Sequence, residues 1–457
     1  MNDLSDVIKA YDVRGIYPDQ INEDLARKVG AAFVEVLGIR QSDGGPGAVV
    51  VGHDMRPSGP SLVAAFTEGV TSHGCDVVQI GLCSTDGIYY AAGSYELPGA
   101  MFTASHNPAE YNGIKLCKVG ASPVGQESGL AEITELILNG IPSYEGEPGK
   151  VSERDSIEGY AEYLRSMVNI EGIRPLKVVA DAGNGMAGLT APVVLGPLPL
   201  DVTEMYYELD GTFPNHEANP IEPENLKDLQ AEVLRQGADI GLAFDGDADR
   251  CFVVDQNGEP VNPSTLTALI AVAELAKDPG SPVIHNLITS DVVPEVIVEN
   301  GGTPVRTRVG HSFIKAKMAE TGAIFGGEHS GHFYFRDFWR ADSGMLAALH
   351  VLAALGHTDP GTTLSEILAP YSRYVQSGEI NSTVDSTADS IAQIRANYEG
   401  REDVSFDELD GLTVRFPDRW FSVRPSNTEP LLRLNVEAET GAQMEQLRDE
   451  VLAQIRG

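Results

Sequence analysis

The sequence predicts an α/β fold. Short apolar runs, typical of buried strands, alternate along the chain with stretches of helical length in which apolar residues recur periodically. That alternation is typical of sheets covered by helices. Most of the predicted strands end in a polar, glycine-rich loop, and ligands of open α/β sheets bind at the carboxyl ends of strands. The 457 residues are enough for three or four domains of ordinary size.

Each element is predicted from its own pattern. The strands are apolar runs expected at Ala48–Val51, Val77–Ile80, Ala100–Thr103, Val178–Ala180, Ile240–Phe244, Cys251–Val254, Val283–Ile284 and Ala323–Phe325. The helices are periodic segments expected at Glu23–Leu37, Pro60–His73, Ile157–Val168, Leu226–Gln236 and Leu266–Ala276. From about Tyr371 strand-like runs alternate and a terminal helix follows over Gly441–Ile455, which predicts a separate small α+β domain. Candidate domain boundaries are the Gly- and Pro-rich residues 140–149, the turn at 255–258 and the stretch near Pro370.

The charge balance restricts the partners. The chain has 32 Lys and Arg against 67 Asp and Glu, a formal charge of −35, so binding to nucleic acid or to an anionic membrane is not expected. An anionic substrate would need a locally basic pocket. The N-terminal residues lack the apolar segment of a secretory signal, and the four cysteines form no CxxC pair. We expect a cytoplasmic protein without a disulfide framework.

The run from Asp245 to Arg250 predicts a metal site. Asp245, Asp247 and Asp249 alternate with small residues directly after a predicted strand. An EF-hand calcium loop is excluded, because its sixth position needs Gly and its twelfth needs Glu, where this chain has Arg250 and Gln256. Carboxylates suit a hard divalent cation, and Mg²⁺ usually joins them to phosphate oxygens.

Ser105 lies in the run Thr103–Pro108, which reads Thr-Ala-Ser-His-Asn-Pro. Two interpretations are open from these residues alone. Ser105 is either the N-cap of a helix or a nucleophile that carries a phosphoryl group. Together with the acidic run, the second interpretation predicts phosphoryl transfer to or from a serine opposite a bound metal.

Several other runs carry polar groups suited to phosphate or sugar. For each of them the alternative is an ordinary structural role, either in a solvent-exposed turn or as a core residue whose hydrogen bonds are satisfied. The candidates are Arg14, Lys115, His311, Glu328, Ser330, His332 and the run Arg424–Glu429. The last run concentrates Arg, Ser, Asn and Thr in one turn, as a phosphate-binding nest does. G-x-S-x-G and GxGxxG motifs are absent, so a serine hydrolase or a dinucleotide-binding dehydrogenase is not supported.

These motifs, in this order, resemble the α-D-phosphohexomutases, and specifically the phosphomannomutase/phosphoglucomutase group. The resemblance covers essentially the whole chain and rests on residues 11–15, 103–108, 245–250, 327–332 and 424–429. It implies three mixed α/β domains of similar core and a smaller C-terminal α+β domain around a central cleft. The expected domains are 1–148 with the phosphoserine loop, 149–256 with the metal loop, 257–370 with the sugar loop, and 371–457 with the phosphate loop.

The resemblance also implies roles for individual residues. Ser105 is expected to carry the phosphoryl group, and an oxygen of that group is expected to join the three aspartates around Mg²⁺. The other expected catalytic residues are Arg14, His106, Lys115 and Arg250. The expected substrate-binding residues are Glu328 and Ser330 for the sugar hydroxyls, Arg424, Ser426, Asn427 and Thr428 for the non-reacting phosphate, and Tyr11, His311 and His332 as further contacts.

The implied function is that of an isomerase that interconverts hexose 6-phosphate and hexose 1-phosphate through a hexose 1,6-bisphosphate, which also serves as activator. Mannose phosphates, and also glucose phosphates, are the expected substrates, because Asn427 is typical of that group. His329 stands where those members usually have Met and glucosamine members usually have Gln. A phosphoglucosamine mutase and a Mg²⁺-dependent phosphatase with Asp245 as nucleophile are the alternatives. A monomer or dimer is expected.

Overall fold

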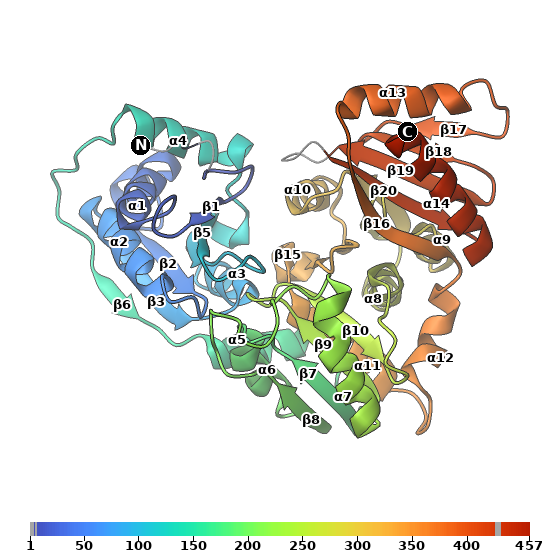
Figure 1. The fold of residues 1–457 in the computed structure, drawn as a ribbon. Helices are drawn as coiled ribbons and strands as arrows, with labels where there is room; N and C mark the ends of the chain where they lie inside the picture. The colour runs from blue at the N-terminus through green and yellow to red at the C-terminus, as the bar shows by residue number, and fades with distance from the viewer. Residues whose placement is uncertain (1–3, 5–6, 426–430) are drawn as a thin grey trace. The chain divides into compact units, whose positions relative to one another are not determined.

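The computed structural model describes residue 4, residues 7–425 and residues 431–457, with the side chains of His311 and Ser312 also outside the description. These residues form two compact units. Unit 1 comprises residues 1–261 and 330–367, and unit 2 comprises residues 262–329 and 368–457. Figure 1 shows the helices and strands of each unit in chain order. No helix within the described ranges is both long and apolar enough to cross a membrane.

Unit 1 begins with a six-stranded mixed sheet. Its strand order is β1 (Val13–Ile16), β5 (Tyr111–Cys117), β4 (Gly99–Phe102), β2 (Ala48–His53), β3 (Asp76–Leu82) and β6 (Val151–Glu153). Strand β2 is parallel to β3 and β4, whereas β5 is antiparallel to β1 and β4. Helices α1 (Glu23–Leu37) and α2 (Gly59–Ser72) pack side by side (Figure 1). The core of this part contains Phe33, Phe66 and Phe102. The connection from β4 to β5 places Ser105 just beyond the carboxyl end of β4.

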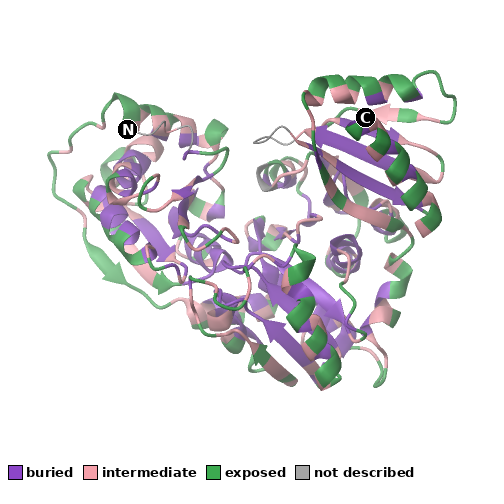
Figure 2. Ribbon diagram, viewed as in Figure 1, coloured by how far each residue is buried: buried purple, intermediate pink, exposed green. Residues whose placement is uncertain are grey.

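A second sheet in unit 1 holds the acidic run. Its strand order is β10 (Cys251–Asp255), β9 (Ile240–Phe244), β7 (Leu176–Asp181) and β8 (Leu200–Met205). Strands β9 and β10 are antiparallel, with Phe244 opposite Cys251, so residues 245–250 form the tight connection between them. Both strands are buried along their whole length (Figure 2). The buried strand pair fixes the two ends of this loop.

The remaining elements of unit 1 complete its layers. They are the helices α3 (Thr85–Ser94), α4 (Leu130–Asn139), α5 (Ile157–Met167), α6 (Ala187–Leu195), α7 (Lys227–Gln236), α11 (Gly344–Gly356) and α12 (Leu364–Leu368), and the strands β14 (Phe333–Phe335) and β15 (Ala341–Asp342). Strands β14 and β15 pair antiparallel.

Unit 2 has a parallel part and an antiparallel part. In the first, β11 (Pro282–Asn286) is parallel to both β12 (Thr303–Thr307) and β13 (Phe325–Gly327), and the helices are α8 (Pro263–Lys277), α9 (Val292–Glu299) and α10 (His311–Thr321). The second is a five-stranded antiparallel sheet of order β16 (Val375–Thr383), β20 (Leu431–Ala438), β19 (Arg419–Pro425), β18 (Leu412–Arg415) and β17 (Ser405–Asp407). Its helices are α13 (Thr387–Tyr398) and α14 (Gly441–Arg456), which share a core with the sheet.

The predicted fold class is confirmed, and the predicted elements are present with shifted ends. The strand expected from Ala323 begins only at Phe325. The helices that are not among the predicted ones are α3, α4, α6, α9, α10, α11, α12 and α13. Nearly every residue of α11 is buried, so the helix lacks the polar face that produces a helical period.

Candidate active site

Ser105 lies in a tight loop and does not cap a helix. The element that follows it is the strand β5, so the N-cap interpretation is wrong. Its backbone is left-handed, with φ 50°, and its N–H donates to Thr103 Oγ1 at 2.8 Å. A non-glycine residue in this conformation needs support from its surroundings. The side chain is buried, with Oγ donating to Asp245 Oδ2 at 2.9 Å and lying 3.1 Å from His106 Nδ1.

Arg56 supplies much of that support. Its side chain is fully buried, and its two terminal nitrogens donate to four backbone carbonyls of the serine loop, those of Ser105, Asn107, Pro108 and Tyr111, at 2.6–2.9 Å. Its Nε donates to the buried carboxylate of Asp54 at 3.2 Å. The five N–H donors of the guanidinium are therefore all used. The sequence pattern marks residues 52–56 only as a polar loop at a strand end, so this role was missed.

Replacing Arg56 with Ala is expected to lower the free energy of unfolding by about 3–5 kcal/mol, because the buried Asp54 carboxylate would lose its charged partner. The loop carbonyls would also be left unpaired. Urea denaturation of both proteins measures this difference. Arg235→Ala removes an exposed arginine that pairs with Glu232 on α7, and should leave stability nearly unchanged. Equal effects of the two substitutions would contradict the role given to Arg56.

The three aspartates form one buried cluster. Asp245, Asp247 and Asp249 are at most 2% exposed, and each offers a carboxylate oxygen within 4.8 Å of the others. Lys115 on β5 donates to Asp247 Oδ2 at 2.7 Å and to Asp249 Oδ2 at 2.8 Å. Arg250 donates through Nε to Asp245 Oδ2 at 2.8 Å and through its backbone N–H to Oδ1. The predicted acidic cage therefore exists at the end of β9.

The cluster has the chemistry of a divalent cation site. Asp247 Oδ1 and Asp249 Oδ1 are buried and, within the described part of the chain, accept no hydrogen bond. Three carboxylates face two cationic side chains, those of Lys115 and Arg250, which leaves an excess of negative charge. Burial raises the pKa of Asp245 well above its ordinary value, a cost that a nearby cation would remove. Mg²⁺, a hard cation that prefers oxygen ligands, fits these residues.

The basic groups around Ser105 differ in charge state. Burial, helped by Arg250 and Arg14, holds the pKa of His106 well below its ordinary value, so this ring is neutral at neutral pH. Burial alone would lower the pKa of Lys115, but Asp247 and Asp249 more than offset it and raise that pKa well above its ordinary value. Lys115 is therefore a cation beside Asp247 and Asp249. Arg14 reaches the serine loop, donating to Asn107 Oδ1 at 2.7 Å.

The last part of the predicted sugar loop also lies near the aspartates. His332 Nε2 is 3.7 Å from Asp249 Oδ1, and its backbone forms an isolated antiparallel bridge with Arg250. Ser330 Oγ lies 2.8 Å from His332 Nδ1, which orients the ring. Tyr11 lies in the bend before β1 with an exposed side chain. Unit 1 thus brings together Ser105, the metal loop, the predicted basic residues and His332.

Unit 2 holds the other predicted residues. Glu328 is buried after β13, where Oε1 accepts from the backbone N–H of Gly310 at 3.0 Å. Arg424 lies on β19, is 7% exposed and pairs with Glu379. His311 begins α10, but its side chain is outside the description. Ser426, Asn427 and Thr428 lie outside the described residues.

Four domain models of one family match successive parts of the chain. The phosphoglucomutase/phosphomannomutase alpha/beta/alpha domains I, II and III match residues 5–141, 158–258 and 262–374, and the C-terminal domain matches residues 379–454. The four domains are thus found in the predicted order. The boundaries expected at 148, 256 and 370 stay a prediction.

Known proteins resemble the chain over its length. The phosphohexose mutases of Xanthomonas campestris pv. campestris are 39% identical over 450 residues, 98% of each chain, and the phosphomannomutase of Escherichia coli K12 is 37% identical over 454 residues, 97% of each chain. A solved phosphoglucomutase/phosphomannomutase family protein from Burkholderia thailandensis is 34% identical and has a TM-score of 0.87, covering 98% of this chain and 97% of that one. This chain belongs to the phosphoglucomutase/phosphomannomutase family.

Proposed function

We propose that this chain is a phosphohexomutase that interconverts hexose 6-phosphate and hexose 1-phosphate, acting on mannose phosphates and also on glucose phosphates. The observation that carries the proposal is the position of Ser105 Oγ, 2.9 Å from Asp245 Oδ2 at a buried cluster of three carboxylates. Both oxygens of Asp245 are engaged by Arg250, and one also accepts from Ser105. That engagement, with the family, disfavours a phosphatase that would use Asp245 as nucleophile.

In the proposed reaction, phosphorylated Ser105 gives its phosphoryl group to a hydroxyl of the sugar phosphate. A bond forms between the sugar oxygen and phosphorus, and the bond between phosphorus and Ser105 Oγ breaks. The sugar hydroxyl loses its proton to a basic group, and Ser105 Oγ gains one. The product is hexose 1,6-bisphosphate, which reverses its orientation and returns its other phosphoryl group to Ser105 by the same exchange. Positioning and charge stabilisation supply most of the catalysis.

Four residues of unit 1 are proposed to assist the phosphoryl transfer. Neutral His106, 3.1 Å from Ser105 Oγ, is placed to exchange the proton of the serine hydroxyl. Lys115 and Arg250 supply fixed positive charge beside the phosphoryl group, and Arg14 holds the serine loop through Asn107. Mg²⁺, when held by the three aspartates and an oxygen of phosphorylated Ser105, would add positive charge at the phosphoryl oxygens.

The other predicted residues are proposed to bind the sugar and the non-reacting phosphate of the substrate. Glu328 and Ser330 are proposed to bind sugar hydroxyls, with Tyr11, His311 and His332 as further contacts. Arg424, Ser426, Asn427 and Thr428 are proposed to bind the non-reacting phosphate, since guanidinium and turn groups suit that anion. Hexose 1,6-bisphosphate is proposed as the activator that phosphorylates Ser105. A cytoplasmic monomer or dimer that binds neither nucleic acid nor membrane stays a prediction.

Mannose and glucose 1-phosphates are expected to have specificity constants within roughly tenfold of each other, because a mutase must bind its intermediate in two orientations and relies on hydroxyls common to both. Glucosamine 1-phosphate is expected to be at least about tenfold poorer, since its ammonium group would enter a pocket made basic for phosphate. Formation of the three 6-phosphates, with a trace of glucose 1,6-bisphosphate and Mg²⁺, measures these constants.

The same assay separates the alternatives. Glucosamine 1-phosphate as the best substrate would identify a phosphoglucosamine mutase. Stoichiometric release of inorganic phosphate without isomerisation would identify a phosphatase. The matched control is the reaction without bisphosphate, in which unphosphorylated protein should show a lag or a lower rate.

A further inference from the structure

Asp86, near the start of α3, is a buried carboxylate that takes no part in the proposed chemistry. It is fully buried, and it accepts hydrogen bonds from three hydroxyl groups. Ser343 Oγ and Tyr160 OH donate to its Oδ2 at 2.6 and 2.8 Å, and Ser84 Oγ donates to its Oδ1. Its surroundings are therefore built to hold a carboxylate in one orientation.

Two of those hydroxyls belong to helix N-caps. Ser84 Oγ caps α3 by accepting from the backbone N–H of Gly87 at 3.2 Å, and Ser343 Oγ caps α11 by accepting from that of Leu346 at 3.0 Å. Each serine thus uses a lone pair for its own helix and its proton for Asp86. The Asp86 carboxylate thus links the N-termini of α3 and α11, although Asp86 and Ser343 are 257 positions apart in the sequence. Helix N-termini also favour a nearby negative charge.

Both helix ends contact the metal loop. Thr85, the first residue of α3, donates through its backbone N–H to the carbonyl of Asp247 at 2.9 Å and through Oγ1 to Asp247 Oδ2 at 2.6 Å. Gly344, the first residue of α11, packs so closely that an added Cβ would lie 2.6 Å from the carbonyl of Arg250. The loop from Asp245 to Arg250 is therefore contacted by the N-terminus of α3 and by the N-terminus of α11, and Asp86 links these two helix ends.

The contact with Thr85 helps to determine which oxygen of Asp247 stays available. Oδ2 accepts from both Thr85 and Lys115, while the buried Oδ1 accepts no hydrogen bond within the described ranges. Hydrogen-bond partners of this kind orient a ligand toward its metal. At other metal sites, loss of such a partner weakens metal binding by about tenfold to a hundredfold. Thr85 and Lys115 thus occupy Oδ2 and leave Oδ1 as the oxygen that is available to a cation.

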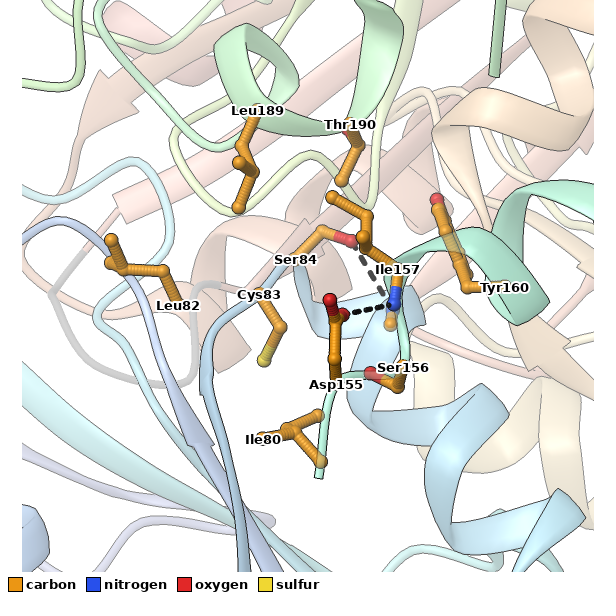
Figure 3. Close-up of a pocket in the computed structure, with 11 residues that line it drawn as sticks. Ile80, Leu82, Cys83, Ser84, Asp155, Ser156, Ile157, Tyr160, Leu189 and Thr190 are labelled. Atoms are coloured by element: carbon orange, nitrogen blue, oxygen red, sulfur yellow. Dashed lines mark hydrogen bonds between the residues drawn. The ribbon is translucent and has the colours of Figure 1, made fainter. Parts of the chain in front are cut away.

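Tyr160 adds a third anchor from α5. Ser84 and Tyr160 line a small pocket of about 30 Å³ with Asp155 and Thr190 (Figure 3). That volume is enough for water and far too small for a sugar phosphate. The pocket therefore belongs to the support of the site and is not a second substrate site. Burial, moderated by the three hydroxyls, raises the pKa of Asp86 to about 7, as expected for a buried carboxyl group.

We propose that Asp86 is a positioning residue for the metal site: by joining the N-termini of α3 and α11 to α5, it holds Thr85 against Asp247 and keeps Asp247 Oδ1 directed at the bound cation. This inference rests on the proposed function for the identity of the cation. Its test is direct metal binding, which reports on positioning whether or not the protein isomerises hexose phosphates.

The experiment titrates the full chain with Mn²⁺ and measures the free ion by electron paramagnetic resonance. Asp86→Asn replaces an acceptor oxygen with an N–H₂ group that cannot accept from a hydroxyl, and Thr85→Val removes the donor to Asp247 at nearly constant volume. Each is expected to raise the Mn²⁺ dissociation constant by roughly tenfold or more. Thr85→Ser keeps the donor and is expected to restore affinity close to that of the wild type. Asp155→Asn changes an exposed aspartate that lines the same pocket; it is the matched control and should leave the Mn²⁺ dissociation constant unchanged.

The double substitution Asp86→Asn with Thr85→Val is expected to weaken Mn²⁺ binding less than the product of the single effects, because both act through Asp247. Unchanged Mn²⁺ affinity in folded Thr85→Val protein would overturn the proposal, even if Asp86→Asn failed to fold. Full additivity of the two substitutions would overturn the link between Asp86 and Thr85. Circular dichroism of each variant verifies the fold.

Discussion

Replacing Ser105 with Ala is expected to reduce mutase turnover by roughly 10⁴-fold or more, as the loss of a covalent nucleophile does in other enzymes. The fold should be retained, because the serine loop is held by the backbone contacts of Arg56, which the substitution leaves in place. Ser105 Oγ contributes a hydrogen bond to Asp245 and lies beside His106, and the methyl group of Ala fits the same space. The measurement is the rate of isomerisation of mannose 1-phosphate with saturating bisphosphate activator.

Intact-mass spectrometry gives an independent measure. The wild type incubated with glucose 1,6-bisphosphate should gain one phosphoryl group, and Ser105→Ala should gain none. Ser143→Ala, an exposed serine in the segment before β6, is the matched control and should behave as the wild type. Wild-type turnover in Ser105→Ala, or phosphorylation that persists in it, would show that another residue carries the phosphoryl group.

Asp247→Asn is expected to weaken Mg²⁺ binding about a hundredfold. A metal ligand contributes at least as much to metal affinity as the groups that orient it. The substitution removes one charge from a cluster whose remaining carboxylates, Asp245 and Asp249, are shared with Arg250 and Lys115. Turnover at low Mg²⁺ should fall with the affinity. Ligand binding to the folded state raises the melting temperature, so the Mg²⁺-induced rise seen in the wild type should be lost at the same concentration.

The exposed Asp201 on β8 provides the control, because Asp201→Asn removes the same charge from the same sheet away from the cluster. Its Mg²⁺-induced thermal shift should equal that of the wild type. Equal shifts in Asp247→Asn and the wild type, or full turnover of the wild type in excess chelator, would rule out a metal at these aspartates.

The local sequence by itself determined several buried strands, the acidic cluster and the family of this protein. Apolar runs bounded by polar loops predicted β2, β7, β9 and β10, because a buried strand needs apolar residues on both faces. Alternate aspartates directly after β9 predicted the acidic cage, since residues so close in the chain are necessarily close in space. The order of five motifs predicted the family, which whole-chain comparison confirms.

Only the tertiary structure decided how separate segments cooperate. The structure excludes the N-cap interpretation of Ser105, because the strand β5 and not a helix follows it. It also places Asp245, 140 positions away in the sequence, beside the Ser105 hydroxyl. That Ser105 carries a phosphoryl group stays a prediction. The roles of Arg56 and Asp86 have no local signature, because their partners are backbone carbonyls and hydroxyl groups brought together by packing. Helix α11 shows the same limit: full burial removes the polar face that marks a helix in a sequence. Chemistry carried by adjacent residues is therefore visible in the chain, whereas support from distant residues appears only after folding.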